Sequence, residues 1–234
     1  MRILIVTDAW EPQVNGVVRT LQATIAELRA QGHVVGVISP DLFRSIPCPT
    51  YGEIRLAFAG KRAVARRIRA FAPEANDIAT EGPLGLAARR WCIDTGFPFT
   101  TAYHTRFPEY VAARIPVSPQ FVWRFIRWFH RPAQHIMVAT RSLKRELAEQ
   151  GLGQTMMWER GVDHALFHPG CPPHPDFAGL ARPIQLYVGR VAVEKNIEAF
   201  LETRHPGTKV IVGDGPALDE LRARFPDACF LGKL

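Results

Sequence analysis

The chain begins with MRILIVTDAWEPQVNGVVRTLQATIAELRAQGHVVGVIS (residues 1–39), and this stretch decides the fold. The apolar run at residues 2–8 is typical of a buried strand, and residues 17–28 repeat apolar side chains at helical spacing. Gly32 ends that helix, and a second apolar strand follows at 33–39. A strand, a helix and a strand in this order form a βαβ unit, which requires a parallel sheet.

The alternation of strands and helices continues along the chain. It predicts helices at 61–72, 84–95, 118–131 and 141–150, and strands at 53–59, 77–80, 98–103, 135–140 and 154–159. We therefore expect an α/β protein whose first domain, residues 1–167, has a doubly wound parallel sheet.

A proline-rich segment, residues 168–183, is predicted to be a linker. A second series follows, with strands at 184–189, 208–213 and 228–231 and helices at 196–204 and 216–225. It is short for an independent domain, so residues 184–234 are expected to be the incomplete start of a second Rossmann-like domain.

Composition narrows the classes of function. The 234 residues carry a formal net charge of +7, which favours an anionic partner. Residues 3–6 form an apolar run that is too short for a signal peptide, so a cytoplasmic location is expected. The four cysteines are widely spaced, which argues against a metal site or a disulfide framework. Nucleic acid is not expected as a partner, because no helix-turn-helix, zinc-finger or RNP pattern supports it.

One loop combines two cations with the end of a predicted strand. The stretch IQLYVGRVAVEKNIEAFL (residues 184–201) predicts a strand, a turn at Gly189, a loop containing Arg190 and Lys195, and a helix. Ligands of open α/β sheets collect at the carboxyl ends of the strands, and cations near a helix N-terminus are better explained if an anion lies between them. Solvated surface charges are the alternative interpretation.

Other residues are predicted at the carboxyl edge of the first sheet. Asn15 and Gly16 follow the first strand and open a helix, where glycine allows a ligand to approach the backbone and the helix N-terminus can receive phosphate. His104 follows the strand at 98–103, and Glu81 follows the strand before it. A histidine there can exchange a proton or a hydrogen bond, although a structural role at the strand end is equally open.

Two predicted helices are basic and amphipathic. One carries Arg62, Arg66 and Arg69 opposite an apolar face, and FVWRFIRWFHR (residues 121–131) mixes aromatic residues with arginines. Such helices suit an anionic membrane surface. The alternative is that each buries its apolar side chains in the core. The membrane-surface candidates are Arg62, Arg66, Arg69, Trp123, Arg124, Arg127 and Trp128.

Taken together, these segments resemble family-four glycosyltransferases, which are retaining enzymes with the two-domain GT-B fold. The similarity is to the bacterial branch of mannosyltransferases and diacylglycerol glycosyltransferases. The motifs that carry it, in chain order, are Val6–Asp8 with Pro12 and Asn15–Val17, Glu81–Gly85, Tyr103–Thr105, Arg160–Asp163 with Phe167 and Pro169, Tyr187–Arg190 with Glu194–Asn196, and Val212–Pro216.

The resemblance implies transfer of a sugar from a nucleotide-sugar, such as GDP-mannose or a UDP-sugar, to a lipid or glycan acceptor with retention and without a cofactor or metal. Arg190 and Lys195 would bind the donor diphosphate, which Gly189, Asn15 and Gly16 would approach, and His104 would lie near the reacting sugar. Glu81, Thr105 and Arg106 are candidates on the acceptor side. Arg160–Asp163 would approach the hinge between the domains.

Two departures from the family accompany the resemblance. The family has two glutamates, seven residues apart, that hold the donor, and the chain ends before their place, so we expect this chain to be inactive. The strand that begins at Ala75-Asn76-Asp77 is also more polar than in relatives. A non-catalytic module that binds anions or a membrane surface, and an enzyme with a soluble sugar acceptor, are the competing hypotheses.

Overall fold

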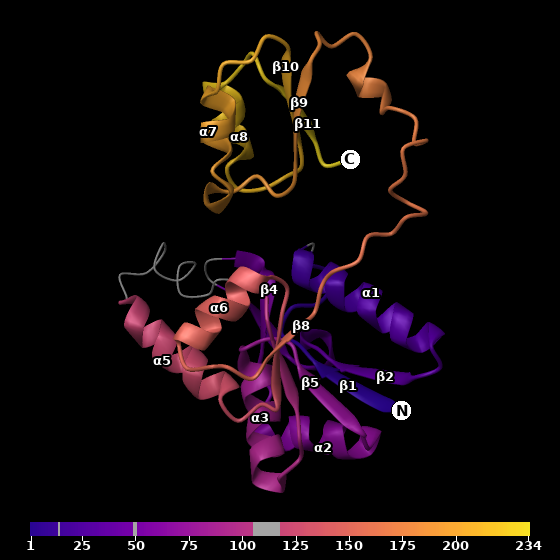
Figure 1. Cartoon of the computed structure of the whole chain (residues 1–234), viewed down its shortest axis with the longest axis vertical. Helices are drawn as coiled ribbons and strands as arrows, with labels where there is room; N and C mark the ends of the chain where they lie inside the picture. The colour runs from indigo at the N-terminus through magenta and orange to yellow at the C-terminus, as the bar shows by residue number, and fades with distance from the viewer. Residues whose placement is uncertain (14, 49–50, 105–117) are drawn as a thin grey trace. The chain divides into compact units, whose positions relative to one another are not determined.

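The computed structural model describes residues 1–13, 15–48, 51–104 and 118–234. These residues form two compact units, Met1–Gly161 and Val162–Leu234 (Figure 1). The finer division predicted from the sequence, with domains at 1–167 and 184–234 and a linker between them, stays a prediction.

The first unit is built on a parallel sheet of six strands in the order β2-β1-β5-β6-β7-β8. This arrangement confirms the parallel sheet that the first 39 residues predict. The order reverses at β1, because β2 lies on one side of it and β5 on the other. The strands are β1 (Arg2–Val6), β2 (Val34–Ile38), β5 (Ala75–Ile78), β6 (Thr100–Tyr103), β7 (His135–Val138) and β8 (Thr155–Met157).

Helices cover both faces of this sheet, because successive side chains of each strand point to opposite faces. Ile5 of β1 packs with Leu21 and Ile25 of helix α1, whereas Leu4 and Val6 pack in the cluster that contains residues of α2 and α3. Figure 1 shows α1 on one side of the sheet and α2 and α3 on the other. The helices of this unit are α1 (Gly16–Ala30), α2 (Lys61–Phe71), α3 (Pro83–Thr95), α5 (Pro119–His130) and α6 (Arg141–Glu149).

The strand predicted at 53–59 exists, but its place in the fold differs from the βαβ pattern. It is β4 (Tyr51–Ala57), which pairs antiparallel with β3 (Ser45–Cys48) in a separate two-stranded sheet. A parallel pairing needs a crossover of about a dozen residues or more, whereas β3 and β4 follow each other almost directly, so the hairpin is the arrangement the chain allows. β3 was not predicted. A short 3₁₀ helix, η1 (Pro40–Leu42), precedes the hairpin.

The second unit contains a parallel sheet in the order β11-β10-β9. Ile197 and Leu201 of α7 and Leu221 of α8 pack with Ile211 of β10 in one buried cluster. These elements follow the strand–helix alternation expected for residues 184–234. The elements are η2 (Pro175–Phe177), β9 (Ile184–Val188), η3 (Val193–Lys195), α7 (Ile197–Glu202), β10 (Thr208–Val212), α8 (Leu218–Arg224) and β11 (Cys229–Gly232).

A buried carboxyl group lies in the middle of the first sheet. Asp77 of β5 lines a 350 Å³ cavity on the α1 side of the sheet, and its Oδ1 accepts a hydrogen bond of 2.7 Å from the Thr100 hydroxyl. Burial raises the pKa of Asp77 from 3.8 to about 7, and the bond from Thr100 offsets only part of that rise. Ionisation of the buried Asp77 therefore lowers the free energy of unfolding at alkaline pH.

We expect Asp77→Asn to stabilise the protein in a pH-dependent way. The folded-state pKa is raised, so the stability contributed by the bound proton is present below pH 3.8 and is lost as the pH rises through about 7. The variant should therefore match the wild type near pH 4 and exceed it by roughly 4 kcal/mol at pH 8. Urea unfolding at the two pH values measures this difference, and a gain that is the same at both would contradict the assignment.

Candidate functional site at the carboxyl edge

The polar residues of the first unit gather where the strand order reverses. β1 and β5 are neighbours in the sheet, and their connections to α1 and α3 leave in opposite directions from their carboxyl ends. Ligands of open α/β sheets bind at such a switch point. The segments that follow β1, β5 and β6 therefore define the candidate site.

Asp8 joins two of these segments. Its Oδ1 accepts a hydrogen bond of 2.8 Å from the Leu84 N–H, and its Oδ2 accepts bonds from the Gly85 N–H (3.2 Å) and the Thr80 hydroxyl (2.9 Å). The carboxylate thus satisfies N–H groups in the first turn of α3, where the helix dipole favours negative charge. Burial raises the pKa of Asp8, and its three donors act against the rise.

Two glycines make this contact sterically allowed. A Cβ on Gly82 would lie 2.4 Å from Cγ of Asp8, and one on Gly85 would lie 1.9 Å from the carbonyl oxygen of Thr80. Neither neighbouring group can move aside to make room for a Cβ atom, because the first is the buried carboxyl group of Asp8 and the second is the backbone of Thr80. The segment from Glu81 to Gly85 is therefore fixed against the end of β1.

Glu81 is held by a buried histidine. Nε2 of His130, the last residue of α5, lies 3.2 Å from Oε1 of Glu81, and its Nδ1 lies 2.8 Å from the Thr101 hydroxyl. Because a carboxylate only accepts hydrogen bonds, Nε2 is the donor in this pair. His130 is fully buried, so it fixes the direction of the Glu81 carboxylate from beneath the site.

His104 presents a nitrogen that is ready for a ligand. Its ring packs 5.6 Å from the ring of Trp158, and its Nε2 atom is buried without a hydrogen-bond partner among the described residues. Burial and, to a smaller extent, the positive charge of Arg160 lower the pKa of His104 from 6.5 to about 4, while Glu81 acts in the opposite direction. His104 is therefore a neutral imidazole at pH 7, able to donate or accept one hydrogen bond.

Arg160 and Gly16 lie beside each other in this unit. A Cβ on Gly16 would be 3.6 Å from Nη1 of Arg160, which is an ordinary contact, so nothing in the described residues requires glycine at that position. The side chain of Asn15 caps α1: its Oδ1 accepts hydrogen bonds of 3.0 Å from the N–H groups of Val17 and Val18. That oxygen is therefore already engaged by the helix.

The cationic loop of the second unit is also built as the sequence suggests. Gly189 has φ +155° and Gly213 has φ +142°, and a Cβ on Gly213 would lie 1.8 Å from the carbonyl oxygen of Gly189. The Tyr187 hydroxyl donates a 2.8 Å hydrogen bond to the carbonyl of Arg190. The loop after β9 thus approaches the loop after β10 closely at the two glycines, and it carries a half-buried Arg190 and an exposed Lys195.

The other predicted residues divide into three groups. Thr105 and Arg106 lie outside the described residues. Arg62, Arg66 and Arg69 are exposed on α2, whose Val64 and Ile68 are buried. On α5, Arg124 is exposed, Trp123 stacks on Tyr103, Arg127 donates to Gln150, and Trp128 lies under the guanidinium of Arg89.

Two absences can be stated for the part of the chain that the structure describes. None of its helices is long and apolar enough to cross a bilayer. No group of three or more His, Cys, Asp or Glu residues within that same part is arranged to hold a metal ion.

Sequence reasoning missed three residues of this site. The motif Val6–Asp8 predicts no role for Asp8, His130 lies in a predicted basic aromatic helix without a role of its own, and Arg160 is expected near a hinge. A carboxylate directly after the first strand was the available signal for Asp8. Nothing local marks the other two, because each meets its partner from a distant part of the chain.

The sequence of the chain is similar to those of known glycosyltransferases. The family model described as Glycosyltransferase Family 4 matches residues 14–166. A GDP-mannose-dependent alpha-mannosyltransferase of Mycolicibacterium smegmatis is 29% identical over 100% of this chain and 68% of its own length. An alpha-monoglucosyldiacylglycerol synthase of Streptococcus pneumoniae is 24% identical over 95% of this chain and 58% of its own length.

A solved structure supports the fold. Sucrose-phosphate synthase from Thermosynechococcus elongatus superimposes with a TM-score of 0.68 at 16% identity, covering 100% of this chain and 70% of that one. This likeness confirms the predicted α/β fold of the GT-B type. With a family model that spans most of the first unit, the chain belongs to glycosyltransferase family 4.

Proposed function

We infer that the protein transfers a sugar from a nucleotide-sugar donor, GDP-mannose or a UDP-sugar, to a lipid or glycan acceptor with retention of configuration. The observation that carries this inference is the neutral His104 at the switch point of the sheet: its Nε2 has no hydrogen-bond partner among the described residues, and burial, with the charge of Arg160, lowers its pKa to about 4. A sugar presents several hydroxyl groups, and a neutral imidazole can bond one of them without bringing a charge.

The proposed roles follow from the chemistry of the side chains. Arg190 and Lys195 bind the donor diphosphate and offset the charge that develops on the leaving phosphate. With retention, the acceptor oxygen bonds to the anomeric carbon on the face from which the diphosphate departs, and the acceptor proton passes to the leaving phosphate oxygen. Glu81, whose direction His130 fixes, lies on the acceptor side. The nucleotide-sugar is a substrate, and we propose no cofactor.

Two relatives support the substrate class in this proposal. The mannosyltransferase is named for its use of GDP-mannose, and the diacylglycerol synthase is named for a glycosylated lipid. The competing hypothesis of a non-catalytic anion-binding module is not favoured, because the chain belongs to a family of transferases. We place the enzyme in the cytoplasm, with contact to the inner face of the membrane.

A transfer assay tests the function. Labelled GDP-mannose or UDP-glucose is incubated with the full-length protein and a bacterial lipid extract, and the label in the organic phase is measured. We expect label in a glycolipid whose anomeric configuration, determined by NMR, equals that of the donor. A product of inverted configuration would overturn the retaining mechanism, and label only in a soluble oligosaccharide product would overturn the lipid acceptor.

Donor binding tests the cationic loop separately. Arg190→Ala and Lys195→Ala should each remove about 1.5–3 kcal/mol of a charge-assisted contact with phosphate, which is about ten- to a hundredfold in the Kd for GDP or UDP. Isothermal titration measures the change. Lys233→Ala is the matched control, since Lys233 is an exposed lysine of the same unit. An equal loss of GDP or UDP affinity in Lys233→Ala would contradict the assignment of Arg190 and Lys195 to the donor diphosphate.

The state of His104 is open to direct measurement. Because the charge of Arg160 lowers the pKa of His104, Arg160→Gln should raise that pKa above its value of about 4. Arg69→Gln, which changes an exposed arginine of α2, should leave it unchanged. NMR titration of the imidazole carbons reports both values. A wild-type His104 that titrates near pH 6.5 would show that the imidazole is not buried beside Arg160.

A further inference from the structure

A chain of buried hydrogen bonds ends on the carboxylate of Glu81. The hydroxyl of Thr101, which is fully buried in β6, lies 2.8 Å from Nδ1 of His130, and Nε2 of His130 lies 3.2 Å from Oε1 of Glu81. Because a carboxylate only accepts hydrogen bonds, Nε2 of the neutral imidazole carries the proton and Nδ1 accepts from the Thr101 hydroxyl. Every donor in the chain therefore points toward Glu81.

Packing gives the His130 ring one orientation. The ring of Phe129 meets it at 78° with the centroids 5.0 Å apart, and the ring of Tyr103 meets it at 82° with the centroids 6.0 Å apart. Both aromatic side chains are themselves buried. A ring that is enclosed in this way in a close-packed interior keeps its orientation, so the direction of the bond to Glu81 is fixed.

The end of α5, which carries His130, is held by α3. Nε of the buried Arg89 donates a 2.8 Å hydrogen bond to the Phe129 carbonyl, and its Nη2 donates to the Trp128 carbonyl. Carbonyls in the last turn of a helix have no partner within the helix, and the dipole favours a cation there. Since α3 begins two residues after Glu81, the helix that follows Glu81 also holds the helix that supports it.

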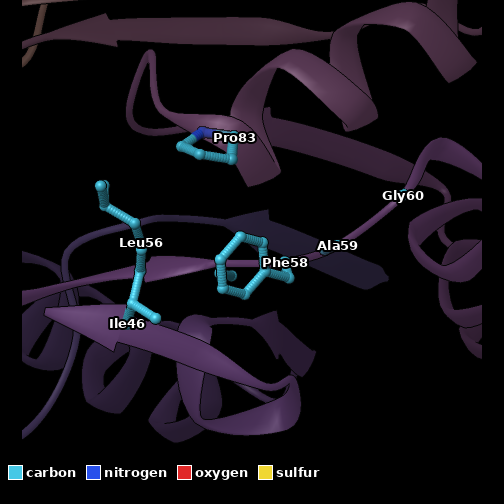
Figure 2. A pocket seen from close by; sticks show the side chains of 7 residues that line it. Ile46, Leu56, Phe58, Ala59, Gly60 and Pro83 are labelled. Carbon is cyan, nitrogen blue, oxygen red and sulfur yellow. The ribbon is translucent and has the colours of Figure 1, made fainter.

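The segment around Glu81 supplies no second donor to its carboxylate among the described residues. Pro83 has no N–H group, and the N–H groups of the next two residues bond to Asp8. Pro83 also borders a pocket of about 530 Å³ on the β3–β4 hairpin, and the side chains that line this pocket are apolar (Figure 2). Its exposed side chains, on the outer face of the hairpin, are Ile46 and Phe58.

The carboxylate of Glu81 keeps capacity for a ligand. The Glu81 side chain is 16% exposed, whereas that of His130 is 0% exposed. The charge of Glu81 acts upward on the pKa of His104 and on the pKa of Asp8, so this carboxylate belongs to the candidate site. A carboxylate can accept about four hydrogen bonds, and the bond from His130 uses one of them.

We propose that His130 is a positioning residue, which holds one oxygen of Glu81 so that the other oxygen accepts a hydrogen bond from a hydroxyl group of the acceptor. The inference rests on the proposed function, because it names a residue that sets acceptor binding in the same enzyme. His130 is buried and acts only through Glu81. It therefore affects the acceptor and not the donor diphosphate, which is assigned to Arg190 and Lys195.

Two amide variants separate this role from core packing. The amide nitrogen of glutamine matches Nε2 of histidine, so His130→Gln keeps a donor to Glu81, whereas the shorter His130→Asn reaches only Thr101. In the transfer assay with the full-length protein, His130→Asn should raise the apparent KM for the bacterial lipid extract about tenfold with little change in kcat. His130→Gln should restore most of that loss.

Other variants test the chain of hydrogen bonds. Thr101→Val keeps the volume of the side chain, removes the donor to Nδ1, and should also raise the KM. Glu81→Gln should raise the KM as His130→Asn does, and combining the two should add little, because both act through one hydrogen bond. Cys92→Ala is the packing control, since Cys92 is buried on α3 and bonds to Asn76 instead of Glu81.

Two measurements do not depend on turnover. Nitrogen NMR of the imidazole should show a proton on Nε2 of His130 and none on Nδ1, and the opposite tautomer would overturn the inference. Isothermal titration should give the same Kd for GDP or UDP in His130→Asn as in the wild type. A weaker Kd in this variant would show that the residue serves the donor, which also overturns the inference.

The kinetic outcomes distinguish this inference from the proposed function. Equal increases of the KM in His130→Gln, His130→Asn and Cys92→Ala would make His130 a purely structural residue and overturn its positioning role. Transfer by the wild type with an unchanged KM in His130→Asn would contradict this inference alone. Absence of transfer by the wild type would contradict the proposed function, together with the inference that rests on it.

Discussion

The carboxylate of Asp8, buried against the first turn of α3, is the constraint on which the first unit depends. It joins the end of β1 to the start of α3 and fixes Glu81, Gly82 and Pro83 between them. The helix supplies N–H groups and a favourable dipole, which compensate for removing a charged group from water. Glu81 and Pro83 both take their positions from this contact.

The framework of the fold was predictable, because it depends on local pattern. Residues 17–28 repeat apolar side chains at helical spacing, and α1 occupies Gly16–Ala30. Glycines at the ends of strands also located the cationic loop at Gly189. The hairpin was not predicted, because the strand at residues 45–48 contains proline and carries no clear alternation, and only pairing with β4 makes it a strand.

The site was predictable only in part, for a related reason. His104 and Glu81 stand directly after strands, so their place at the carboxyl edge follows from the alternation alone. The support of Glu81 by His130 depends on α5 ending beside β6, and the influence of Arg160 on His104 depends on the chain returning to the same edge after β8. Such contacts join residues far apart in sequence, and no local pattern records them.

The hairpin stands outside the parallel sheet, because β3 and β4 form a two-stranded sheet of their own. Evolution can therefore exchange the outward side chains at positions 46, 56 and 58 without disturbing the six-stranded sheet. Divergence of this surface within the family would then require few substitutions on one short appendage. Its members could differ there while their central framework remains unchanged.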